Sequence, residues 1–102
     1  MKIFWTDIAF YQLQDIFDYY KVKANIRTAR KITTKLIDCS LSLENNPKLG
    51  RIEELLQGRK EEFRFLVDGN YKIVYWIDEE QNLIFIASVF DCRQNPEKLK
   101  TL

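Results

Sequence analysis

The chain has 102 residues, of which 46% are hydrophobic and 30% charged, and its formal net charge at pH 7 is +1. This length allows one domain with one modest core, and the composition excludes an intrinsically disordered chain. We therefore expect a single domain over residues 1–102. The net charge gives no information about a polyanionic partner, because a local basic patch can be hidden in a near-neutral total.

The residue inventory also limits the chemistry. There is no histidine, which excludes Ser-His-Asp, Cys-His and imidazole acid–base catalysis. Cys39 and Cys92 lie far apart in the sequence, so we expect reduced thiols, and two cysteines without histidine cannot complete a structural zinc site. We expect no metal and no cofactor. No stretch has the roughly 20 apolar residues that cross a bilayer, and no signal-peptide pattern is present, so we expect a cytoplasmic protein.

Residues 2–5 form a short β-prone segment, which two segments of helical periodicity follow. Thr6 or Asp7 can cap the first helix, whose apolar residues recur at helical spacing to about residue 23. Asn25 can cap the second helix, and the proline of residues 45–47 ends it, since proline lacks an amide hydrogen. Only a few residues separate the two helices, so the sequence predicts an antiparallel helical hairpin.

The fold is built around residues 62–93, which read as three strands. Apolar and polar residues alternate in the first run, and large side chains alternate with a period of two in the second. Asp68-Gly69 favours a tight hairpin between these runs. Residues 83–90 are almost continuously apolar, which is typical of a central strand covered on both faces. We expect most of the aromatic residues here to be core residues, namely Phe63, Phe65, Tyr71, Tyr75, Trp76, Phe85 and Phe90.

Weaker patterns lie on either side of this region. We predict that residues 48–61 form a connecting loop with room for one helical turn, and that residues 97–102 form a short tail that frays. The order β-α-α-β-β-β predicts an α+β fold, with an N-terminal strand, an antiparallel helical hairpin and a three-stranded antiparallel meander. The helices should pack on one face of the sheet, and the first strand should lie beside one of the later three.

Two groups of basic residues are candidates for contact with a polyanion. On the second helix, Arg27, Lys31 and Lys35 align along one face with Arg30 beside them, and we interpret this group as a solvated surface. The second group could converge on the sheet face opposite the helices, where guanidinium groups and aromatic rings suit phosphates and bases. The alternative is that Arg64 pairs with Glu61 or Glu62 and that the Lys72 side chain only covers apolar surface. This second group is Arg51, Arg59, Lys60, Arg64, Lys72 and Arg93.

Four short motifs follow one another along the chain, namely Asn46-Pro47, Gly50-Arg51, Asn70–Tyr75 and Val89–Pro96. In this order they resemble the RelE/ParE superfamily of bacterial toxins. The resemblance covers nearly the whole chain. It implies the same β-α-α-β-β-β arrangement.

The RelE branch cleaves messenger RNA on the ribosome without a metal, using basic residues of the sheet and a C-terminal Tyr or His. The resemblance implies that Lys72 and Arg93 match two of the basic positions, and it makes Lys72, Arg64 and Arg93 the catalytic residues if the chain is a ribonuclease. Two features depart from that branch. Phe63 and Phe65 stand where lysines are found, and Leu99 or Lys100 stands where the C-terminal Tyr or His would be.

The ParE branch, often labelled plasmid stabilisation, lacks the ribonuclease residues and poisons DNA gyrase by binding it. The sequence motifs of this chain are closer to those of the ParE branch, so we expect a non-enzymatic toxin that inhibits growth. Its expected target-binding surface is drawn from Arg51, Arg59, Arg64, Lys72 and Arg93. The resemblance also implies a cognate antitoxin that wraps across the toxin along the helical hairpin groove and a sheet edge, giving a hetero-oligomer. The alternatives are a ribosome-dependent mRNA endoribonuclease, and an inert relative that only keeps antitoxin binding.

Overall fold

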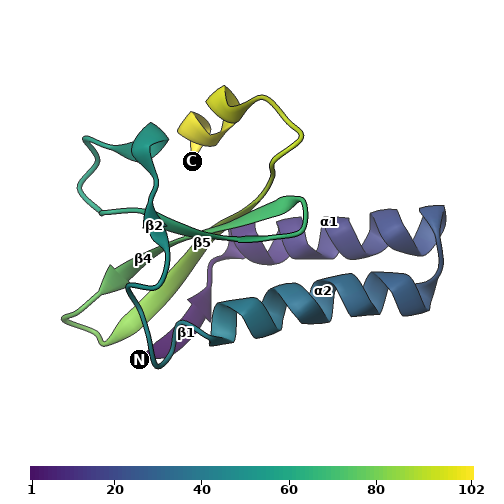
Figure 1. The fold of residues 1–102 in the computed structure, drawn as a ribbon, viewed down its shortest axis with the longest axis horizontal. Coiled ribbons are helices and arrows are strands. Elements are labelled where there is room, and N and C mark those ends of the chain that lie inside the picture. The colour runs from purple at the N-terminus through teal and green to yellow at the C-terminus, as the bar shows by residue number, and fades with distance from the viewer.

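Two long helices, five strands and two short 3-10 helices make up the fold in the computed structural model, which describes residues 1–102 (Figure 1). Neither long helix combines the length and the apolar character that crossing a membrane requires. In chain order the elements are β1 (Lys2–Trp5), α1 (Asp7–Lys23), α2 (Ile26–Leu41), β2 (Arg51–Ile52), η1 (Glu54–Leu56), β3 (Arg64–Asp68), β4 (Tyr71–Asp78), β5 (Leu83–Asp91) and η2 (Pro96–Thr101).

The five strands form one mixed sheet in the order β1-β5-β4-β3-β2. Strands β3, β4 and β5 are the antiparallel meander that the sequence predicts, and β1 runs parallel to β5 at one edge. The α+β arrangement is confirmed. The two-residue β2 pairs with β3 at the other edge and was not predicted, because a pair of residues carries no periodicity.

The hairpin between β3 and β4 turns one residue later than predicted. Asp68 pairs with Tyr71, so the two loop residues are Gly69 and Asn70, and Gly69 has a φ of 58°. Glycine adopts this left-handed conformation without steric cost.

Side-chain caps begin both helices. The hydroxyl of Thr6 accepts from the amide of Ala9 at 3.3 Å and donates to the carbonyl of Ile86 at 2.8 Å, which ties the start of α1 to β5. The side chain of Asn25 accepts from the amide of Thr28 at 2.8 Å. The predicted hairpin of α1 and α2 is confirmed, although α2 ends at Leu41 and the chain continues in turns before it reaches proline.

The sheet carries a hydrophobic cluster on each face, so both faces are covered. The first cluster joins the helices to the sheet through residues such as Ile16, Leu36 and Tyr75. The second lies on the other face and contains Leu56 of η1 and Leu99 of η2. The loop of residues 48–61 is therefore more structured than predicted. The prediction of a fraying tail is wrong, because Leu99 is only 2% exposed and packs against the sheet.

A buried tyrosine fixes the chain where it enters β2. The hydroxyl of Tyr75 donates to the carbonyl of Pro47 at 2.7 Å and accepts from the amide of Gly50 at 2.9 Å. A Cβ atom at residue 50 would lie 2.7 Å from this hydroxyl and 2.7 Å from the carbonyl oxygen of Phe65. Only glycine fits this close approach, which positions β2 against β3.

Candidate functional site

Strand β5 is longer than β1, and this leaves part of its outer edge without a neighbouring strand. The last residue pair between them is Trp5 with Ile86, after which the chain turns into α1. The side chain of Gln12, on α1, takes the vacant position. Its Oε1 accepts from the amide of Val89 at 2.8 Å and from the hydroxyl of Ser88 at 3.1 Å.

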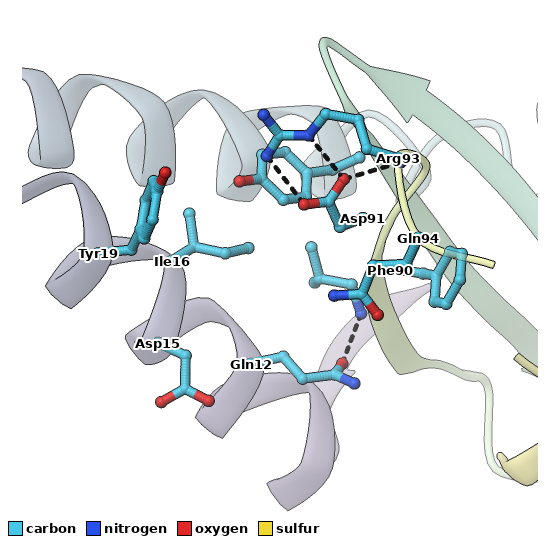
Figure 2. A pocket seen from close by; sticks show the side chains of 10 residues that line it. Gln12, Asp15, Ile16, Tyr19, Phe90, Asp91, Arg93 and Gln94 are labelled. Atoms are coloured by element: carbon cyan, nitrogen blue, oxygen red, sulfur yellow. Dashed lines mark hydrogen bonds and ion pairs between the residues drawn. The ribbon is translucent and has the colours of Figure 1, made fainter. Parts of the chain in front are cut away.

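A cavity of about 450 Å³ lies between α1 and this edge of β5 (Figure 2). Ile16 and Val89 are buried beside it, whereas Tyr19 is half-exposed at its side. The cavity therefore combines apolar surface with polar groups, as ligand sites do. Its lining residues are Gln12, Asp15, Ile16, Tyr19, Tyr71, Val89, Phe90, Asp91, Arg93 and Gln94.

The charged groups of the cavity are dominated by a bidentate ion pair. Arg93 donates from Nε and Nη2 to the two oxygens of Asp91 at 3.0 and 2.8 Å, and its backbone amide also donates to Asp91 Oδ1 at 2.9 Å. The side-chain hydrogen bonds from Arg93 hold the pKa of Asp91 below its ordinary value, and the pair raises the pKa of the guanidinium. Asp91 thus balances the charge of Arg93, whose side chain is 54% exposed.

Lys72, the other basic residue that matches the superfamily pattern, lies on the opposite face of the sheet. Its Nζ is 2.8 Å from Oε2 of Glu53, which is only 4% exposed, and 4.3 Å from the centre of the Phe65 ring. Glu53 also accepts from the amide of Leu55 through its other oxygen. Lys72 therefore holds η1 against the sheet.

Two arginines of the predicted group bond to the chain itself. Arg64 donates to the carbonyl of Gly50 at 2.9 Å and pairs with Glu62 at 3.2 Å, as the sequence alternative proposed. Arg59 donates to the carbonyls of Lys100 and Leu102, which fixes the last residues of the chain.

The structure does not bring the predicted basic group together. Arg51 and Lys60 are exposed and Lys72 lies on the η1 side, while Arg93 lies near α1. The expected convergence on one sheet face fails because η1 and η2 cover that face. On α2, Arg27, Arg30 and Lys31 are exposed as predicted, and Lys35 pairs with Asp68 at 3.3 Å.

The helical hairpin exposes apolar side chains away from the sheet. A shallow groove of about 210 Å³ runs between α1 and α2, where Phe10, Leu13 and Phe17 meet Thr33. Several large apolar residues of the two helices are at least one-third exposed, namely Ile8, Phe10, Tyr11, Tyr19, Val22, Ile26, Ile37 and Leu41. Phe10, Leu13 and Phe17 lie together at the groove, which makes the groove a candidate site of protein contact.

Comparison with known proteins identifies the family. Residues 3–96 match the family described as ParE toxin of type II toxin-antitoxin system, parDE. The chain belongs to the ParE toxin family. A solved structure described as the chromosomal ParDE TA system from P. aeruginosa is similar in fold, with a TM-score of 0.74 and 22% identity over 89% of this chain and 95% of that chain. None of the curated proteins matches the sequence.

The open β5 edge of this ParE family member was not found from the sequence. Gln12, Asp15 and Tyr19 look like the polar side of an amphipathic helix, and only the length difference between β1 and β5 exposes their role. Glu53 was also missed, since one acidic residue in a loop has no pattern. Both cysteines are free, and burial raises the pKa of the Cys39 and Cys92 thiols.

Proposed function

We propose that this ParE family member is a toxin that binds and poisons a replication enzyme, DNA gyrase, and that a cognate antitoxin neutralises it in the cytoplasm. The observation that carries the choice of a binding toxin over a ribonuclease is the buried Lys72–Glu53 pair. Its carboxylate partner neutralises the lysine, and η1 and η2 cover the adjacent sheet face. A phosphate would have to break this pair and leave the buried carboxylate of Glu53 without its counter-charge, which is costly.

The other two residues of the expected ribonuclease centre, Arg64 and Arg93, are either bonded to the chain itself or distant from Lys72. Arg64 bonds to the Gly50 carbonyl and Glu62, and Arg93 lies near α1 on the other side of the sheet. General acid–base catalysis needs groups that converge on one substrate proton. This separation supports a surface that binds a protein.

Within the predicted target-binding surface, two residues keep outward-facing guanidinium groups. Arg51 is exposed on β2, and Arg93 is exposed at the β5 cavity. We propose that these two contact the target, while Arg59, Arg64 and Lys72 maintain the shape of the surface. Guanidinium groups suit this role because they pair with carboxylates in a bidentate geometry.

The antitoxin site that we propose is the hairpin groove together with a sheet edge. Phe10, Leu13 and Phe17 give the groove an apolar wall, which fits the apolar face of an amphipathic helix. A helix seated there would bury side chains that are now in contact with water.

The test is induction in cells with separate readouts, followed by assays on purified components. We expect a DNA damage response with translation continuing, and inhibition of supercoiling by purified gyrase. Arg51→Ala and Arg93→Ala should each weaken this inhibition, and Arg27→Ala on the solvated face of α2 is the matched control. Rapid translation arrest with cut messages on ribosomes and no DNA damage would overturn the proposal in favour of the endoribonuclease, and harmless expression at high level would leave only an inert relative.

The antitoxin part of the proposal has its own test. Coexpression with the protein encoded by an adjacent reading frame should restore growth, and Phe10→Asp in the groove should abolish this rescue while toxicity remains. Lys31→Asp, on the exposed basic face of α2, is the control for added negative charge.

A further inference from the structure

The basic residues of the chain are distributed unevenly. No acidic residue lies between Asp18 and Asp38, whereas six of the 16 lysines and arginines lie there. The rest of the chain therefore has ten basic and 15 acidic residues, so a segment with a formal charge of +6 belongs to a molecule whose other residues sum to −5. The six basic residues are Lys21, Lys23, Arg27, Arg30, Lys31 and Lys35.

Most of these residues lie towards the free end of the helical hairpin. Helices α1 and α2 extend beyond the sheet, and the turn that joins them is far from the strands (Figure 1). All six side chains are exposed. Lys35 alone is in an ion pair, with Asp68 at 3.3 Å, and its side chain is still 71% exposed. The other five have no carboxylate in the chain that balances their charge.

On α2 the basic residues form one continuous face. Arg27, Arg30, Lys31 and Lys35 follow one another at spacings that keep them on the same side of a helix, and the exposed Thr34 lies among them. We call these five residues the α2 basic face. The helix rises 1.5 Å per residue, so the face is about 12 Å long. The buried residues of α2 lie on the opposite side, namely Ala29, Thr33, Leu36 and Ser40.

We propose that the α2 basic face binds the phosphate backbone of duplex DNA. Duplex DNA carries one negative charge for about 1.7 Å of its axis, so a face of this length meets several phosphates. The guanidinium groups of Arg27 and Arg30 match phosphate oxygens in a bidentate geometry, and the hydroxyl of Thr34 can donate to another. Binding releases the cations that surround the DNA, which supplies the free energy.

The side chains of the face also select among polyanions. The face has no aromatic ring that could stack on an unpaired base, as proteins that bind single strands use. It has no apolar side chain that could enter a lipid layer. Val22 and Ile26 are exposed at the turn, but two aliphatic residues give little apolar area for holding a helix on a membrane. Duplex DNA fits best, because its phosphates alone supply the contacts.

This site goes beyond the proposed function. The α2 basic face includes neither Arg51 nor Arg93, and it needs no gyrase. Contacts with phosphates carry no sequence information, so binding is independent of the DNA sequence.

The experiment titrates the full chain into a fluorescein-labelled duplex of about 20 base pairs and follows fluorescence anisotropy. We expect saturable binding at about 50 mM salt, with log K falling linearly against log salt at a slope of about −3 to −5. Arg30→Gln with Lys31→Gln should weaken binding about tenfold or more and reduce the steepness of the slope by about 1.8, because two phosphate contacts are lost. Glutamine keeps a high helix propensity, so α2 should stay folded.

A matched control removes the same charge from outside the hairpin. Lys2→Gln with Lys60→Gln changes two exposed lysines and should leave the affinity within about twofold of wild type. The proposal is overturned if wild type does not bind the duplex, or if the two double variants weaken binding equally. It is also overturned if poly-glutamate of equal charge displaces the duplex as well as unlabelled DNA does, or if vesicles with phosphatidylserine bind more tightly. The assay contains no gyrase, so its failure would leave the proposed gyrase inhibition untouched.

Discussion

Lys72 and Arg93 each pair with a carboxylate at 2.8 Å, yet their surroundings differ. The partner of Lys72 is 4% exposed and lies beneath η1, whereas Arg93 is 54% exposed beside an open cavity. Ion pairs with the same distance therefore have different roles in the two places. A pair removed from water contributes to the fold, and a pair at the surface remains available for a partner.

The largest effect should follow from breaking the Lys72 pair. Lys72→Met leaves the buried carboxylate of Glu53 without its counter-charge, and we expect a loss of about 3 kcal/mol in the free energy of unfolding, measured with urea. The double variant Lys72→Met with Glu53→Leu removes both charges and should recover most of this loss. Full stability of the single variant would show that the pair has no role in the fold.

The next effect concerns Tyr75. Tyr75→Phe leaves the buried amide of Gly50 and the carbonyl of Pro47 without their hydrogen bonds, so we expect a loss of about 2 kcal/mol in the free energy of unfolding. Tyr19→Phe, at a half-exposed tyrosine on α1, is the control and should change stability little. Equal stability of the two variants would contradict the prediction.

A smaller effect should follow from Arg59→Ala. It removes the hydrogen bonds to the carbonyls of Lys100 and Leu102, which lie at the surface, so we expect a loss of about 1 kcal/mol or less. Hydrogen exchange should become faster in η2 but not in β4. Lys60→Ala is the neighbouring control, and equal protection of η2 in both variants would show that Arg59 does not hold the tail.

The smallest loss of stability at pH 7 should come from Arg93→Ala, because its pair with Asp91 lies at the surface and contributes little. The pH dependence should change instead. The pKa of Asp91 lies below 3.8 in the folded chain, so the pair stabilises fully above that pH and loses its contribution as the pH falls through the lower pKa. In Arg93→Ala the Asp91 pKa should rise, which carboxyl NMR titration measures. An unchanged Asp91 pKa would refute this role of Arg93.

The difference between these two basic residues also explains what the sequence could predict. Alternation, turn residues and helix caps gave the two helices and the three long strands, because each is a local pattern with a fixed period. The same patterns could not show that η1 and η2 cover the second face of the sheet. Leu56 and Leu99 lie in segments without periodicity, and Glu53 meets Lys72 only through the tertiary fold.

The candidate site depended even more on tertiary structure. Arg93 was singled out by its position after the last strand, but its neighbours Gln12 and Asp15 come from the opposite end of the chain. Their role depends on where β1 stops along β5. No sequence pattern predicts where β1 ends along β5, because the two strands are about 80 residues apart in the sequence.

The parallel pairing of β1 with β5 has a consequence for the timing of biosynthesis. Lys2 pairs with Leu83 and Trp5 with Ile86, so the first strand cannot join the sheet until residues 83–86 have left the ribosome. Contacts of such long sequence separation form slowly, because a large loop must be closed first. A growing chain therefore lacks both the β5 cavity and the finished sheet. The surface around β1 exists only after β5 has been synthesised, so the first strand remains unpaired while the intervening residues are made.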